Sequence, residues 1–159
     1  MLGSKLVKVF LSLDKKELRQ LRKWLQSPMH NEHQEVCKLF GFLMSRYNLN
    51  ATTLKKERVW KYIYGDKEYK DLRMRHLMSF ALEVLEEFVS YKSLKSNGFL
   101  QEKVRAEHYF NQKLIQPARQ SIKKASNKLQ KIQAQNEEYH LNQYQLEVLK
   151  FDFLNKEIN

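Results

Sequence analysis

The chain has 159 residues, of which 42% are apolar and 30% are charged, and its formal net charge is +11. This length matches one domain, or one domain and part of another, and no apolar run approaches the roughly 20 residues that cross a membrane. The single cysteine, Cys37, excludes an intramolecular disulfide and fits a reducing compartment, so we expect a cytoplasmic protein. With only four glycines and two prolines, the composition is typical of an all-α protein.

The first part of the chain predicts two short helices. Apolar residues at helical spacing predict a helix over 4–11. Asp14 followed by Glu17 resembles a capping box, which starts a second helix that ends near residue 26 because Pro28 disfavours helical geometry before it. The expected buried stripe of this second helix is Leu18, Leu21, Trp24 and Leu25.

Two further helices are expected before the middle of the chain. Asn31 with Gln34 repeats the capping pattern for a third helix that reaches about residue 47. Either Thr52 or Thr53 caps a fourth helix, which Gly65 ends in a left-handed conformation. The expected core faces of these two helices are Val36, Leu39, Phe40, Leu43 and Tyr47, and Val59, Trp60, Ile63 and Tyr64.

Residues 69–95 form the most apolar stretch of the chain. At 100° per residue their apolar side chains fill an arc of roughly 200°, about twice the stripe of a surface helix. A helix of this kind has to be covered by several neighbours, so we predict that it lies at the centre of the fold. The side chains that we expect to be nearly fully buried are Leu77, Val84, Leu85 and Phe88. The other aromatic residues assigned to the core are Trp24, Trp60 and Phe80.

The last third of the chain predicts a helix over 99–115, a break at Gln116-Pro117 and a helix with Pro117 at its first position. The seam of this later helix is Ala118, Ile122, Ala125, Leu129 and Ile132. A bend or break is expected near 133–137, because the apolar residues resume on a different phase after it. The amphipathic pattern is unfinished at Asn159, which indicates a chain cut short of a longer protein.

These elements predict an all-α fold of six to eight helices packed around the central helix of about 69–95, followed by a C-terminal helical hairpin. We expect an N-terminal helical domain over 1–98. A C-terminal helical segment over 99–159 is expected to pack on this domain.

Three segments carry a resemblance to known proteins: LSLDKKELRQLRKWLQSPMHN, LKKERVWKYIYGDKEYKDLRMRHLMSFALEVLEEF and EEYHLNQYQLEVLKFDF. In this order they resemble the N-terminal region of a group of uncharacterised all-helical bacterial proteins. That resemblance implies an all-helical fold and transfers no catalytic residue.

A second resemblance covers residues 58–85, RVWKYIYGDKEYKDLRMRHLMSFALEVL. They are similar to the helix pair of winged-helix domains in bacterial transcription activators, where an Arg with a Ser four residues later opens the recognition helix. Arg75 and Ser79 match that pair, which implies DNA binding. The following segment, SYKSLKSNGFLQEKV, supplies no β-hairpin wing.

Catalytic and metal-binding patterns are weak in this sequence. His30, His33 and Cys37 form the one cluster of metal-ligand type, and no second Cys/His pair completes the three or four ligands that zinc requires. The glycines are isolated, so no phosphate-binding loop is present, and adjacent glutamates point to different sides of a helix. We therefore expect no enzyme activity, no metal site and no cofactor.

The positive charge is concentrated in two zones, with a net charge of +9 over 1–75 and +6 over 113–131. Residues 76–112 and 132–159 carry −1 and −3. The simpler interpretation of the basic helix faces is solvation, and the alternative is contact with a nucleic acid or an acidic partner. The residues concerned are Lys15, Arg19, Arg22, Lys23, Arg73, Arg75, Arg119, Lys123, Lys124, Lys128 and Lys131.

The apolar stripe near the C-terminus has few expected partners within the chain. A stripe of this kind ordinarily marks contact with another chain or with missing sequence. We therefore predict a non-enzymatic helical protein–protein interaction or scaffold module, part of a larger protein. The alternative is a nonspecific nucleic-acid-binding or regulatory protein. The expected protein contacts are Leu141, Tyr144, Val148, Phe151 and Leu154.

Overall fold

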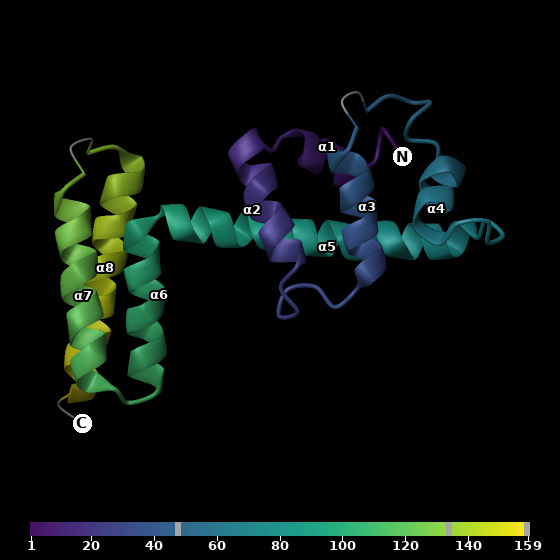
Figure 1. The fold of residues 1–159 in the computed structure, drawn as a ribbon. Coiled ribbons are helices and arrows are strands. Elements are labelled where there is room, and N and C mark those ends of the chain that lie inside the picture. Colours follow the sequence, from purple (N-terminus) through teal and green to yellow (C-terminus); the bar gives the residue numbers. More distant parts are fainter. Residues whose placement is uncertain (47–48, 133–134, 158–159) are drawn as a thin grey trace. The chain divides into compact units, whose positions relative to one another are not determined.

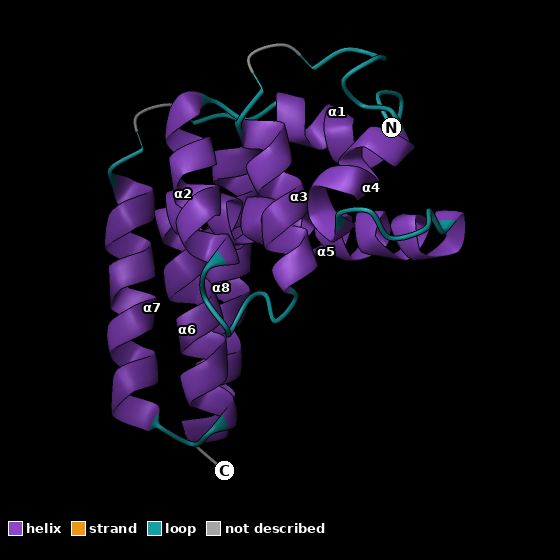
Figure 2. Cartoon of the chain, turned by 45° about the vertical axis from the view of Figure 1, so that its right-hand side comes forward, coloured by secondary structure: helices purple, strands orange, loops and turns teal. Residues whose placement is uncertain are grey.

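The computed structural model of the chain describes residues 1–46, 49–132 and 135–157. All regular structure in these ranges is α-helical and no strand occurs in them, which confirms the all-α prediction of six to eight helices (Figures 1 and 2). None of the described helices is long and apolar enough to cross a membrane. In chain order the helices are α1 (Lys5–Leu11), α2 (Lys15–Leu25), α3 (Gln34–Met44), α4 (Lys56–Tyr64), α5 (Asp71–Ser96), α6 (Gly98–Asn111), α7 (Ile115–Gln130) and α8 (Glu137–Glu157).

The chain divides into two compact units, an N-terminal unit, Met1–Ser90, and a C-terminal unit, Tyr91–Asn159. The division lies within α5, eight residues before the boundary expected between 98 and 99. Each unit contains its own cluster of buried apolar side chains. Two separate cores therefore stabilise the chain.

In the N-terminal unit, α1 to α4 lie along one side of α5 (Figure 1). The predicted burial of four side chains of α5 is confirmed, because Leu77, Val84, Leu85 and Phe88 are 5%, 9%, 0% and 3% exposed. Together with Met74 and Ala81 they form a stripe of about 100°, at 3.6 residues per turn. One layer of helices covers only this stripe, which is about half of the apolar arc.

Phe80 lies outside the covered stripe. Its side chain is 44% exposed and its ring stacks on His33, with ring centroids 5.0 Å apart. The prediction that Phe80 belongs to the core is therefore wrong. Trp60 is buried as expected, and Trp24 is half-buried against the core.

The starts of α1 and α2 are set by local side-chain caps. Ser4 caps α1 by accepting from the Val7 N–H. The Asp14 carboxylate accepts from the Glu17 N–H at 2.7 Å, and the Glu17 carboxylate accepts from the Asp14 N–H at 2.8 Å. This reciprocal pair confirms the predicted capping box and the start of α2.

The predicted cap of α3 by Asn31 is wrong. Helix α3 begins at Gln34, and its N-cap residue His33 makes no side-chain capping bond. The Asn31 amide instead donates to the Leu25 carbonyl oxygen at 3.1 Å and to Cys37 Sγ at 3.1 Å. The Asn31 side-chain oxygen, which a cap would need as acceptor, accepts from the His33 N–H at 3.1 Å and is therefore not available to the helix. Helix α3 ends at Met44, and the predicted core residue Tyr47 lies outside the described residues.

The predicted cap of α4 by Thr52 or Thr53 is also wrong, because α4 begins only at Lys56. The Asn50 side-chain oxygen accepts from the N–H groups of Thr52 and Thr53, at 3.0 and 2.9 Å, and forms a separate turn. Gly65 ends α4 as expected with a positive φ of 70°, but its ψ of −139° is not left-handed helical. Only glycine readily adopts this conformation.

In the C-terminal unit, α6, α7 and α8 lie side by side (Figure 1), and α7 with α8 forms the predicted helical hairpin. Asn97 caps α6 by accepting from the Leu100 N–H at 2.9 Å. The next break occurs at 112–114, where Lys113 has a φ of 60°, and not at Gln116-Pro117 as predicted. Pro117 is the third residue of α7, within the first turn, where its missing N–H costs no helical bond.

The predicted seam of α7 is buried except at its last member. Ala118, Ile122, Ala125 and Leu129 are buried, whereas Ile132 is 42% exposed. The assignment of Ile132 to the seam is wrong because α7 ends at Gln130. The predicted break between the last two helices is confirmed by the start of α8 at Glu137, although residues 133–134 of that break lie outside the described residues.

Candidate functional site

Helix α8 has two apolar faces. The inner face packs against α6 and α7 through Leu146 and Phe153, which are 3% and 6% exposed, with half-buried Tyr139 and Leu149 beside them. The second face points away from this core. We call it the α8 apolar face, and its members are Leu141, Tyr144, Val148, Phe151 and Leu154, which are 55%, 68%, 40%, 64% and 56% exposed.

A groove between α6 and α8 adjoins the α8 apolar face. It has a volume of about 650 Å³. Lys103 lies at its α6 side, where Nζ donates to Gln145 Oε1 at 3.1 Å and lies 3.7 Å from Glu107 Oε1. The charge of Lys103 is therefore engaged within the groove. The lining residues are Lys103, Glu107, Phe110, Asn111, Tyr144, Gln145, Val148, Leu149, Asp152 and Asn155.

The groove was not predicted in full from the sequence. Tyr144 and Val148 were expected as protein contacts, whereas its α6 side was missed. The sequence does contain an i,i+4 pair of Lys103 and Glu107 on this side. That pair indicates a groove only when α6 lies beside α8.

The basic face of α2 is open to solvent. Lys15, Arg19, Arg22 and Lys23 are all exposed, and none of them forms an ion pair with another described residue. The four side chains therefore face solvent, and their contact with a nucleic acid or an acidic partner stays a prediction.

Two arginines of α5 that were grouped with the basic faces are engaged within the N-terminal unit. Arg73 lies over the Tyr64 ring, 4.7 Å from its centroid, and its guanidinium is 3.3 Å from Glu35. Arg75 Nε lies 2.8 Å from the Asp71 carboxylate. Both pairs are solvent-exposed.

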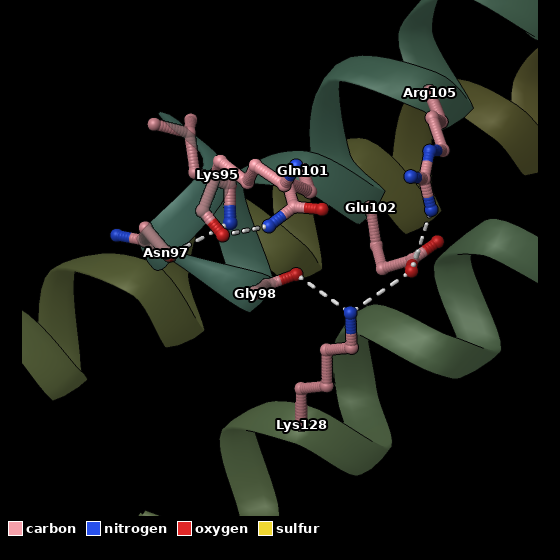
Figure 3. A network of polar contacts seen from close by, with 8 residues as sticks. Lys95, Asn97, Gly98, Gln101, Glu102, Arg105 and Lys128 are labelled. Atoms are coloured by element: carbon pink, nitrogen blue, oxygen red, sulfur yellow. Dashed lines mark hydrogen bonds and ion pairs between the residues drawn. The ribbon is translucent and has the colours of Figure 1, made fainter. Parts of the chain in front are cut away.

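The basic residues of α7 and of its C-cap are not equivalent. Lys123, Lys124 and Lys131 are exposed and form no ion pair among the described residues, and Arg119 lies over the Phe153 ring at 5.8 Å. Lys128 turns instead toward α6. Its Nζ donates to the Gly98 carbonyl oxygen at 3.2 Å and to Glu102 Oε1 at 3.0 Å (Figure 3).

Glu102 is the polar centre of this contact between α6 and α7. It is 3% exposed, and its Oε1 also accepts from Arg105 at 3.0 Å (Figure 3). The other oxygen, Oε2, is buried and accepts no hydrogen bond from the described residues. An ideal Cβ on Gly98 would lie 3.1 Å from Lys128 Cδ, so the missing side chain leaves room for the lysine stem. Glu102 was missed from the sequence, although it falls at helical spacing between Phe99 and Ala106 on the buried seam of α6.

The pKa of Glu102 reflects two opposing effects, burial and the nearby cations. Burial raises the pKa of its carboxyl, but the hydrogen bond and charge of Lys128, with the charges of Arg105 and Lys124, bring the pKa below its ordinary value. The folded state therefore binds the proton less tightly than the unfolded chain. The stabilisation is complete above the ordinary glutamate pKa of about 4.3 and is lost as the pH falls through the lowered pKa.

We expect Glu102→Gln to remove this pH dependence. The free energy of unfolding of the native chain should fall relative to the variant as the pH decreases from about 7 to about 3, because only the native chain protonates a paired carboxylate. Urea denaturation followed by circular dichroism at each pH measures the difference. The quantity compared is the free energy of unfolding of the native chain minus that of Glu102→Gln. If it stays constant or increases as the pH falls, the lowered pKa is contradicted.

His30, His33 and Cys37 do not converge. His30 stacks on Trp24 with ring centroids 3.5 Å apart, and His33 stacks on Phe80. Cys37 Sγ donates to the Leu25 carbonyl oxygen at 3.2 Å. Among the described residues no group of three or more His, Cys, Asp or Glu side chains is arranged to hold a metal ion.

Comparison of the chain with protein-family models, with curated proteins and with solved structures finds no match.

Proposed function

We propose that the chain is a non-enzymatic helical protein–protein interaction module that docks a partner on the α8 apolar face and the adjoining groove. The observation that carries this proposal is the exposure of five large apolar side chains on one face of a 21-residue helix. Monomeric proteins rarely leave contiguous apolar patches of this kind in water, and larger ones mark interaction sites.

The chemistry of the groove also supports docking. Its lining includes the apolar side chains of Phe110, Val148 and Leu149, and its lysine is held by Gln145 and Glu107. Aromatic side chains such as Tyr144 and Phe151 are the residues that contribute most to binding at protein interfaces. The groove therefore offers apolar pockets beside aromatic anchors.

A helical peptide with leucines at positions 3–4 residues apart and glutamine elsewhere is expected to bind the chain. We expect Tyr144→Ser with Phe151→Ser to weaken binding by at least about tenfold, because each buried aromatic contributes roughly 1.5–3 kcal/mol. Fluorescence anisotropy of the labelled peptide measures the affinity, and sedimentation velocity at rising protein concentration detects self-association through the same face.

Leu72→Ser with Leu11→Ser is the matched control, because these leucines are 62% and 54% exposed and lie in the N-terminal unit. Neither peptide binding nor self-association should change in the control. A chain that shows neither behaviour, or that responds equally to both double variants, would refute the proposal.

A second candidate function is nonspecific nucleic-acid binding by the exposed basic faces. The observation that favours it is the set of lysines and arginines on α2 and α7 that lack an ion pair among the described residues. Lysine predominates on α7, which favours phosphate contact over base recognition.

If the chain binds nucleic acid, the logarithm of its binding constant should fall linearly with the logarithm of the salt concentration. We expect Lys123→Gln, Lys124→Gln and Lys131→Gln together to reduce the magnitude of that slope by two to three units, at roughly 0.7–0.9 per phosphate contact. Fluorescence anisotropy with duplex and single-stranded DNA and RNA over a salt series measures the slope. Lys128 is left unchanged because it stabilises Glu102. The absence of binding at low salt would leave these faces with a solvation role.

A further inference from the structure

We infer that the occupant of the α8 apolar face is an amphipathic helix of a partner protein that carries Lys or Arg beside its apolar seam. The inference rests on the proposed function and adds the secondary structure and the charge of the partner. Both follow from the shape of the groove and from the charges around it.

The shape of the groove selects a helix. Between Leu141 and Leu154 the α8 apolar face is about 20 Å long, at 1.5 Å per residue, which matches a helix of about four turns. A helix laid between α6 and α8 would be a fourth member of the bundle that α6, α7 and α8 begin. A peptide that binds by adding a β-strand would need an open strand edge, and the described residues contain no strand.

The charges around the α8 apolar face are acidic, although the chain as a whole carries a net charge of +11. Helical spacing places Asp152 on the groove side of the face, Glu147 on its other side, and Glu137 one turn before Leu141. Asp152 and Glu137 form no ion pair with another described residue.

The two lysines near the same face are neutralised locally. Lys103 is engaged by Gln145 and Glu107, and Lys150 lies 2.8 Å from Glu147. The described part of α8 up to residue 155 carries four acids and one lysine, a net charge of −3. Basic residues beside the apolar seam of a partner helix would therefore meet uncompensated carboxylates.

The same charges argue against a second copy of this chain as the occupant. A two-fold interface through the α8 apolar face would bring Asp152 and Glu137 of both copies to the same surface. It would also join two chains that each carry a net charge of +11. Like charges at an interface oppose association, whereas a basic helix is attracted to this face.

The test uses three labelled helical peptides of about 16 residues with the same leucine seam and with lysine, glutamine or glutamate beside it. Fluorescence anisotropy with the full chain should give affinities in the order lysine, glutamine, glutamate, with about tenfold between the extremes at low salt, because several exposed ion pairs each add a small gain. The lysine preference should shrink as salt is added.

Charge variants identify which carboxylates set the preference. Asp152→Asn with Glu137→Gln should reduce the lysine preference to about threefold or less while the glutamine peptide keeps its affinity. Glu83→Gln with Glu87→Gln is the matched control, because it makes the same change of net charge on an exposed part of α5. A lysine preference that falls equally in both double variants would overturn the inference.

The remaining outcomes separate this inference from the proposed function. If the glutamate peptide binds as tightly as the lysine peptide, and Phe151→Ser weakens both, docking stands and the basic partner is overturned. Self-association of the chain that Phe151→Ser abolishes also supports docking and overturns the basic helix as the occupant. If no peptide binds and the chain does not associate, both proposals fall.

Discussion

Replacing Leu85 by alanine is expected to lower the free energy of unfolding of the N-terminal unit by about 2–5 kcal/mol. The Leu85 side chain is 0% exposed and belongs to the cluster in which α1 to α4 meet α5. Alanine would lose the transfer free energy of the buried methyl groups and leave a cavity that the close-packed neighbours fill only in part. Urea denaturation measures the loss.

Tryptophan fluorescence is the suitable probe because both tryptophans, Trp24 and Trp60, lie in the N-terminal unit, and Trp24 packs edge-on against Phe88 with centroids 5.9 Å apart. Leu72→Ala is the control on the same helix, since Leu72 is 62% exposed and its loss should stay within about 0.5 kcal/mol. A loss below about 1 kcal/mol for Leu85→Ala would contradict the packing of α5 described above.

Replacing Lys128 by methionine is expected to destabilise the C-terminal unit by about 1–3 kcal/mol. Methionine keeps an apolar stem over Gly98 but removes the ammonium group that Glu102 Oε1 accepts from. The buried carboxylate would keep one ion-pair partner among the described residues, Arg105, whose side chain is 51% exposed. The loss stays below that of a fully buried pair because this second cation remains.

Thermal unfolding followed by circular dichroism measures this effect, since the C-terminal unit has no tryptophan. Lys123→Met is the matched control on the same helix, because Lys123 is exposed and forms no ion pair with a described residue. Adding Glu102→Gln to Lys128→Met should recover part of the loss, because it removes the buried charge. Equal effects of Lys123→Met and Lys128→Met would refute the pairing.

Local chemistry set the start of α2 but not that of α3. Asp14 and Glu17 lie three residues apart, and both bonds of the box form within one turn, so no distant residue has to intervene. Asn31 and Asn50 have the same local preference, but their side chains bond to loop backbone and, for Asn31, to Cys37 on α3. The Asn31 oxygen that a cap would use accepts instead from the His33 N–H, and its NH2 group donates to Leu25 and Cys37, so α3 begins only at Gln34.

One part of the candidate site was predictable from the sequence and another part was not. The α8 apolar face was predictable because its five members follow helical spacing within one helix, and the inner face of α8 has the other phase. The groove and the role of Lys128 were not predictable, because they depend on contacts between residues that are 42 and 26 positions apart in sequence. A lysine on a solvated face and one that pairs with a buried acid look identical in the sequence of α7.

The sequence by itself determined that the chain is helical, where most helices lie and that α8 carries more apolar surface than one contact needs. These properties arise from periodicity and from a shortage of helix breakers, and both act over one or two turns. Only the tertiary structure decided which part of the apolar arc of α5 is buried, leaving Phe80 outside, and which lysine pairs with Glu102. Burial is a property of contacts between helices, and the number of neighbours on each side of a helix is not encoded in its own spacing.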